Sequence, residues 1–131
     1  MTAFRTMLGR TIIEIIGHEG SDELIFTCAG NERFKMYHEQ DCCESVELAE
    51  VVGDFNDIIG HEIIEAEEVS NSNDAAAKPD EYCDSWTWTF YKLGTKNGFV
   101  TLRWLGTSNG YYSESVHFEA VNNNREVLYW R

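Results

Sequence analysis

The chain has 131 residues, of which 43% are hydrophobic and 13% aromatic, and its formal net charge at pH 7 is −13. This length and apolar content suffice for one self-contained domain spanning residues 1–131, which excludes a disordered protein. The negative charge excludes a chain that gains affinity by neutralising phosphates, so we expect no direct binding to nucleic acid. No apolar run is long enough for a membrane span and no signal-peptide pattern begins the chain, which predicts a cytoplasmic protein.

The negative charge is concentrated in one third of the sequence. Residues 39–84 hold fifteen carboxylates against the single base Lys78, which gives −14, while the other 85 residues sum to +1. A surface of this kind is attracted to positive charge and steers it at low salt. We therefore expect a partner protein with a basic surface. Its plainer interpretation is a solvated face that keeps the protein soluble.

In the first half of the chain, β-branched and alternating apolar residues predict strands, with one short helix before the last of them. The strands are expected at 11–17, 23–29, 33–38, 46–48 and 61–69, and the helix at 54–59.

A loop at 70–84 follows, which carries the single proline and few large apolar residues, and we expect it to be mobile. Strands are then expected at 86–93, 99–105, 111–121 and 126–130. Short turns between about eight strands predict a mainly β protein, a β-rich form of the α+β class. The sheet is antiparallel, either curled or a partly closed barrel, with one short helix.

The pair Asn97-Gly98 is a strong hairpin signal, because both residues tolerate the positive φ of a tight turn. A two-residue turn at that position places Lys92 directly opposite Arg103. Like charges in this arrangement destabilise a sheet unless an anion lies between them. That anion is either a phosphate-bearing ligand or the chain's own acidic segment, and a four-residue loop with another register removes the conflict.

Thiols, an imidazole and carboxylates crowd into a polar cluster of His38, Asp41, Cys42, Cys43 and Glu44. The spacing matches no zinc module, and neighbouring carboxylates raise the pKa of a thiol, so we expect no metal, no cofactor and no reactive cysteine. All four cysteines of the chain are expected to be free thiols. The plainer interpretation is that one cysteine packs in the core while Asp41 and Glu44 bind backbone amides of the turn.

A second candidate site is a turn rich in tyrosine and small polar residues, the kind of surface that grips a ligand or a protein. Together with the two cations of the hairpin it gives a candidate ligand-binding set of Lys92, Arg103, Ser108, Asn109, Tyr111, Tyr112 and Glu114. Its plainer interpretation is a turn between two strands. The candidate acidic interaction face is Glu62, Glu65, Glu67 and Glu68.

Several stretches are distinctive as strings: YHEQDCCESV at 37–46, GDFNDIIG at 53–60, WTFYKL at 88–93 and SNGYYSESV at 108–116. With them the chain resembles, from about Leu8 to Phe118, an uncharacterised family of short proteins encoded mostly by bacteriophages. The resemblance implies a phage accessory protein without an established activity or known catalytic residues.

Such a protein is expected to bind a host protein stoichiometrically in the cytoplasm of the infected or lysogenic cell, for example to counter a defence factor. The alternative is a small-ligand or nucleotide-binding protein, a sponge, that uses the 108–114 turn. The four histidines form no recognisable triad and no phosphate loop or nucleophile elbow is present, so an enzyme is the least favoured class. Self-association into a homo-oligomer stays open.

Overall fold

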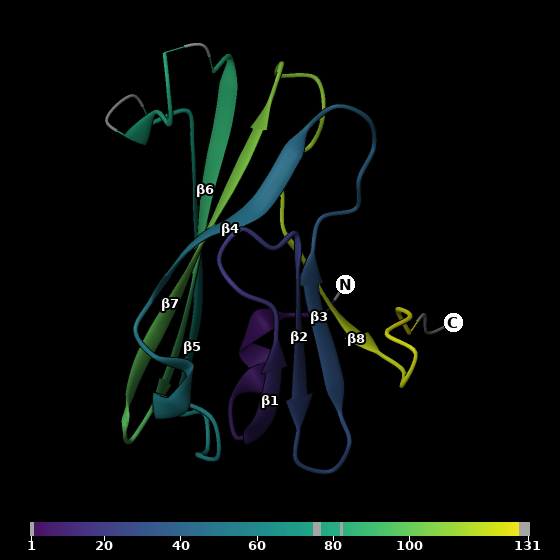
Figure 1. Cartoon of the computed structure of the whole chain (residues 1–131), viewed down its shortest axis with the longest axis vertical. Coiled ribbons are helices and arrows are strands. Elements are labelled where there is room, and N and C mark those ends of the chain that lie inside the picture. Colours follow the sequence, from purple (N-terminus) through teal and green to yellow (C-terminus); the bar gives the residue numbers. More distant parts are fainter. Residues whose placement is uncertain (1, 75–76, 82, 129–131) are drawn as a thin grey trace.

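The structure, a computed structural model, describes residues 2–74, 77–81 and 83–128. Its strands form two antiparallel four-stranded sheets that lie face to face as two layers (Figure 1). Sheet I has the strand order β1 (Ile12–Ile16), β2 (Glu23–Cys28), β3 (Arg33–Tyr37) and β8 (His117–Val121). Sheet II has the order β4 (Ser45–Val52), β7 (Gly98–Ser108), β6 (Ser85–Thr95) and β5 (Glu65–Ser72). The mainly β, antiparallel prediction is confirmed, and in the described residues the strands form two stacked open sheets.

The core lies between the two layers and is closed by the N-terminal segment. A 3-10 helix, η1 (Phe4–Met7), which the sequence pattern did not predict, buries Phe4 and Met7. The ring centroid of Phe4 lies 4.7 Å from that of Tyr91 in sheet II and 5.3 Å from that of Phe118 in sheet I. One side chain therefore bridges the two sheets. No helix among the described residues has the length and apolar character needed to cross a bilayer.

The predicted short helix is present as a second 3-10 helix, η2 (Phe55–Asp57), which Asp54 caps by accepting the backbone N–H of Asn56 at 2.9 Å. Strand β5 begins later than predicted, at Glu65. The preceding residues instead contact the N-terminal segment, since Ile63 donates its N–H to the Arg10 carbonyl at 2.8 Å and Glu62 bridges Thr11.

The register of the β6–β7 hairpin differs from the predicted one. Thr95 pairs with Gly98, so the two loop residues are Lys96 and Asn97 rather than Asn97 and Gly98. The Thr95 hydroxyl donates to the Asp57 carbonyl at 2.7 Å and accepts the Asn97 N–H at 3.2 Å, which fixes the turn. Lys92 consequently lies opposite Thr101, and Arg103 opposite Phe90. The predicted Lys92–Arg103 pair is wrong.

The loop between β5 and β6 starts at residue 73, because residues 70–72 of the predicted loop continue β5. Its described part is tied to β6 by two indole groups: Trp86 donates to the Asp74 carbonyl at 3.1 Å and Trp88 to the Ala77 carbonyl at 2.7 Å. Near the C-terminus β8 is shorter than the predicted 111–121. Of the strand predicted at 126–130, Val127 forms a bridge with Val121, and residues 129 and 130 lie outside the described residues.

Candidate functional site

His38 and Glu44 form a buried ion pair just beyond the end of β3. The His38 Nε2 atom lies 2.7 Å from Glu44 Oε2, and the two side chains are 2% and 0% exposed. The Glu44 carboxylate also accepts the backbone N–H groups of Asp41 and Cys42, each at 2.9 Å. Glu44 therefore closes the turn between β3 and β4, as the plainer interpretation of the polar cluster predicted, whereas Asp41 contributes its backbone amide.

Hydrogen bonds occupy both ring nitrogens of His38 and keep the Glu44 carboxyl ionised. His38 Nδ1 lies 2.6 Å from the carbonyl oxygen of Ser115, which can only accept a hydrogen bond. The hydrogen bond from His38, followed by the backbone N–H groups, lowers the pKa of Glu44 to about 2, so this carboxyl is ionised at neutral pH. Both ring nitrogens of His38 are thus engaged, Nδ1 by the Ser115 carbonyl and Nε2 by the Glu44 carboxylate, so neither is directed at the solvent as a general base.

The ring of His117 lies beside that of His38, with 5.8 Å between the two ring centroids. Burial, followed by the charge of His38, lowers the pKa of His117.

The cysteines differ from the expectation of four free thiols. Cys42 and Cys43 form a disulfide, because the chain bends between β3 and β4 instead of running extended and pointing the two sulfurs apart. Both are exposed, so neither packs in the core as predicted. Cys28 is the core cysteine, and burial raises its pKa to about 11. Among the described side chains, no group of three or more His, Cys, Asp or Glu residues is placed to hold a metal ion.

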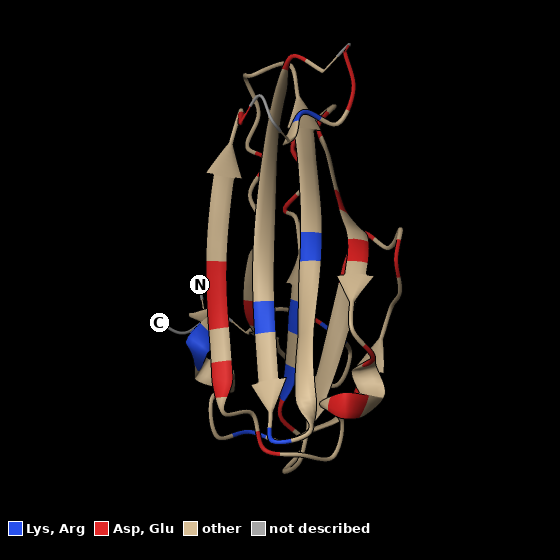
Figure 2. Ribbon diagram, turned by 90° about the vertical axis from the view of Figure 1, so that its left-hand side faces the viewer, with Lys and Arg blue, Asp and Glu red and all other residues tan. Residues whose placement is uncertain are grey.

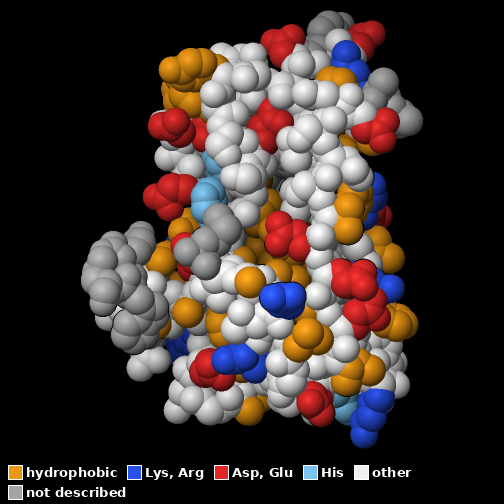
Figure 3. Space-filling model, turned by 180° about the vertical axis from the view of Figure 1, so that it is seen from behind, with side chains coloured by type: hydrophobic (Ala, Val, Ile, Leu, Met, Phe, Trp, Pro, Cys, Tyr) orange, Lys and Arg blue, Asp and Glu red, His pale blue; other side chains and the backbone are white. Residues whose placement is uncertain are grey.

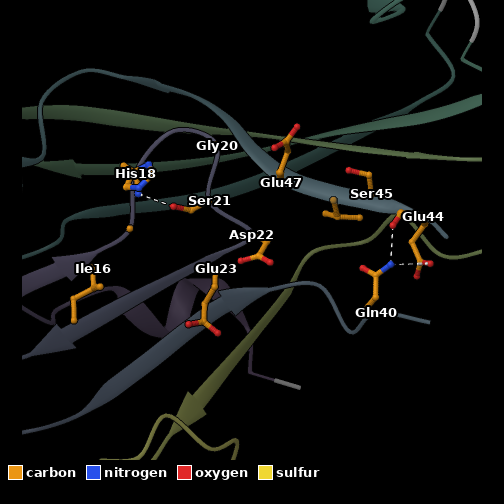
Figure 4. Close-up of a pocket in the computed structure, with 12 residues that line it drawn as sticks. Ile16, His18, Gly20, Ser21, Asp22, Glu23, Gln40, Glu44, Ser45 and Glu47 are labelled. Atoms are coloured by element: carbon orange, nitrogen blue, oxygen red, sulfur yellow. Dashed lines mark hydrogen bonds between the residues drawn. The ribbon is translucent and has the colours of Figure 1, made fainter. Parts of the chain in front are cut away.

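A groove of about 690 Å³ opens beside Glu44, between the β1–β2 loop and the start of β4. Its charged lining consists of carboxylates, from Asp22, Glu23, Glu44 and Glu47, and its lining residues include His18 but no lysine or arginine. Figure 4 shows Asp22 and Glu23 on one wall and Gln40 and Glu44 on another, with Glu47 projecting from β4. This groove, which we call the acidic groove, unites carboxylates from three separate segments.

Two of the four carboxylates in the acidic groove are already paired. Glu23 lies 3.3 Å from the ammonium of Lys35, and Glu44 is bound to His38. Asp22 and Glu47 are exposed and have no ion pair within the described part of the chain. They are therefore the charges that the groove offers to a cation.

The β1–β2 loop is held in place by hydrogen bonds to β4. Gly20 donates its N–H to the Leu48 carbonyl at 2.7 Å, and Leu48 donates to the Ser21 carbonyl at 2.8 Å. Val51 also donates its N–H to the Glu19 carboxylate at 2.8 Å. These bonds fix the wall that carries Asp22 against the strand that carries Glu47, so the groove is preformed.

The second predicted site, the 108–114 turn, is present but its polar groups bind one another. Ser108 donates to the Glu114 carboxylate, which also accepts the Thr87 hydroxyl at 2.7 Å. The Asn109 side chain accepts the Tyr111 N–H at 3.0 Å. Glu114 packs where Gly106 leaves room for it, which explains why residues 111–116 do not continue β8. Tyr111 remains 82% exposed.

This turn and Cys43 of the polar cluster together line a second pocket of about 370 Å³. Ser108, Asn109 and Tyr112 line it together with Cys43 and Cys83, and Asp80 and Asp84 supply its charges. The two sites that the sequence suggested separately are thus neighbours in space. The Asp80 and Asp84 carboxylates would repel a phosphate group placed in the pocket.

Lys92 and Arg103 do not join the 108–114 turn, because they lie on the outer face of sheet II. Lys92 pairs with Glu65 at 3.4 Å, and Arg103 pairs with Glu50. The Arg103 guanidinium also lies 4.8 Å from the ring centroid of Trp88. Figure 2 shows basic positions on the central strands of this sheet and acidic positions on both flanking strands. Of the two anions considered for these cations, the chain's own carboxylates fill the role.

The predicted acidic face is not a single face. Alternation along β5 directs Glu65 and Glu67 to the outer side of sheet II and Glu68 to the inner side, while Glu62 precedes the strand. Glu68 accepts a hydrogen bond from Tyr91, and burial raises the pKa of Glu68. Figure 3 shows acidic side chains spread over the back of the molecule among polar and apolar ones.

The sequence interpretation missed Asp22 and Glu47 as candidate functional residues. They are 25 positions apart, and only the pairing of the β1–β2 loop with β4 brings them to one groove. The one local signal was the acidic pair Asp22-Glu23 immediately before a strand, which is too common to be diagnostic.

The family model for the domain of unknown function DUF7448 matches residues 5–118. The chain therefore belongs to the DUF7448 family, and the match includes every element from β1 to β7. No curated protein and no solved structure matches the chain.

Proposed function

We propose that this member of the DUF7448 family is a stoichiometric binding protein whose acidic groove receives basic side chains of a partner protein. The observation that carries the proposal is the groove itself: a preformed hollow of about 690 Å³ whose described lining has four carboxylates and neither lysine nor arginine. Asp22 and Glu47 are exposed there without an ion pair among the described residues. Lysine or arginine from a partner supplies the missing charge.

Binding is favoured over catalysis by the state of the polar cluster. Both ring nitrogens of His38 are engaged, by Glu44 and by the Ser115 carbonyl, so the buried histidine closest to the groove has no role as a base. The alternative of a nucleotide or small-ligand sponge at the 108–114 turn is less favoured, because the pocket there carries Asp80 and Asp84 and no cation.

The resemblance to phage-encoded proteins gives the proposal its setting. There the partner is a host protein with a basic groove or loop, for example a defence factor, bound in the cytoplasm of the infected or lysogenic cell. A protein of net charge −13 reaches such a surface quickly at low ionic strength, and the attraction weakens as salt screens it.

The test is affinity capture from a bacterial lysate at low and high salt with three forms of the protein. The groove variant is Asp22→Asn with Glu47→Gln, and the control variant is Glu14→Gln with Glu62→Gln, which removes the same charge at exposed positions outside the groove. A basic protein captured at low salt by the wild type and the control variant, but not by the groove variant, is the expected result. Equal capture by all three forms overturns the proposal.

A further inference from the structure

Strand β5 forms one edge of sheet II and is paired along one side only. It pairs with β6 over all of Glu65–Ser72 without a register shift. Just beyond it, Asn73 donates its N–H to the Trp86 carbonyl, which marks odd-numbered residues as the ones that bond toward β6. The backbone groups of Ala66, Glu68 and Ser70 therefore point away from the sheet. Within the described residues no other backbone group forms a hydrogen bond with them, although η1 packs close to β5.

The other sheet edges are covered or interrupted. The β1–β2 loop bonds to β4 through Gly20 and Ser21, and Thr2 and Leu128 bond to β8. Strand β1 is shorter, carries an irregularity after Ile12 and is met by the segment around residue 60. An eight-residue edge such as β5 can template pairing with another strand, and its glutamates, among them the inward-pointing Glu68, restrict which strands can pair with it.

The charges along β5 select what can pair with it. Glu65, Glu67 and Glu68 lie within four residues, and the strand itself contains no basic residue. A second copy of β5 would place three carboxylates from each chain along one seam, which is repulsive. An extended segment carrying lysine or arginine on alternate residues would place its cations beside Glu65 and Glu67 on the outer face.

We infer that the free edge of β5 accepts an extended, lysine- or arginine-bearing segment of a partner protein as a fifth strand of sheet II. Main-chain hydrogen bonds to residues 66, 68 and 70 hold the added strand, and the glutamates select its charge. This surface is separate from the acidic groove, which borders β4 at the opposite edge of the same sheet. It therefore stands or falls independently of the proposed function.

The test uses a capped peptide in which lysine alternates with valine and threonine, added to the whole protein at low salt. Amide hydrogen exchange is followed by NMR. A peptide of the same sequence, N-methylated on alternate residues so that it cannot bond to an edge, is the matched ligand control. The variant Ser70→Pro removes one outward N–H and leaves the β5–β6 backbone bonds in place. Its control is Ser70→Ala, which keeps that N–H. Both variants lose the side-chain hydrogen bond between Ser70 and Thr89, so they differ in the outward N–H.

The expected result is that the peptide slows exchange at residues 66, 68 and 70 by about tenfold or more, while the N-methylated peptide has no effect. Ser70→Pro weakens binding about tenfold relative to Ser70→Ala. The groove variant leaves this protection unchanged, which separates the two proposals. Unchanged exchange at these amides, or equal binding of the N-methylated peptide to the wild type, overturns the inference. So does protection that grows with protein concentration alone, because it would assign the edge to a second copy.

Discussion

At the scale of single residues, the polar cluster after β3 stabilises the turn into β4, and the start of β4 lines the acidic groove. Glu44 satisfies His38 and two backbone amides, and its neighbours Ser45, Val46 and Glu47 begin β4 and line the groove. A charge that is buried and fully hydrogen-bonded fixes local geometry, since removing any partner leaves the others unsatisfied. The buried members of the polar cluster, His38 and Glu44, therefore help to position the acidic groove.

Because of the Glu44–His38 pair, we expect the stability of the fold to decrease as the pH falls below 4.5. Because the folded-state pKa of Glu44 lies near 2, below its usual 4.5, ionised Glu44 stabilises the fold above pH 4.5. That contribution is lost as the pH falls from 4.5 toward 2. In Glu44→Gln we expect a lower melting temperature at neutral pH and a smaller further decrease over this interval than in the wild type. Melting followed by circular dichroism checks this, with Glu14→Gln as the exposed control, and parallel curves for wild type and Glu44→Gln would contradict it.

The β1–β2 loop depends on a second single residue, Gly17. Its φ is +128°, and a Cβ added there would lie 2.8 Å from the Glu23 carbonyl oxygen. Gly17→Ala is expected to destabilise the protein by at least about 2 kcal/mol, through backbone strain and displacement of the groove wall. Gly20 has a positive φ but open space around it, so Gly20→Ala should cost only about 1 kcal/mol. Urea denaturation measures both, and an equal cost would refute the crowding at Gly17.

At the scale of elements, the sequence pattern predicts what depends on local alternation and misses what depends on distant contacts. Phe34 and Met36 alternate with polar residues, and this alternation correctly predicted the position of strand β3. The hairpin register depends on Thr95, whose partner Asp57 is 38 residues away, and on Gly94, which leaves room for the ring of Phe99 opposite. The Asp57 contact lies outside the hairpin's sequence, and the local pattern favours Asn97-Gly98 as the turn, so the turn was placed one residue too late.

Helix η1 is the element whose importance the sequence least reveals, because it is one short turn near the N-terminus. Its Phe4 contacts rings from both sheets, so Phe4→Ala opens a cavity between the layers. We expect a loss of about 3–5 kcal/mol in the free energy of unfolding. The control Ile13→Ala, at a side chain that is 52% exposed, should change it by no more than about 0.5 kcal/mol. Comparable losses in the two variants would mean that η1 does not join the sheets.

At the scale of the whole molecule, the sequence gives the sign of the charge and the region that carries it, but it does not show how the folded chain distributes these charges over its surface. Fifteen carboxylates in residues 39–84 mark the region, yet β5 divides its glutamates between two faces and Lys92 and Arg103 neutralise others. The acidic groove arises where two loops and β4 converge, and Asp22, one of its exposed charges, lies outside the acidic third. In the proposed function, net charge would direct a basic partner to the molecule and the acidic groove would give it a place to bind.

The measurement that tests this account most directly is the dissociation constant of a short arginine-rich peptide for wild type, the groove variant and the charge-matched control variant at low salt. If the groove is the binding surface, Asp22→Asn with Glu47→Gln weakens binding by about tenfold or more relative to Glu14→Gln with Glu62→Gln. If both variants weaken binding equally, the attraction comes from net charge alone and the acidic groove is not the site.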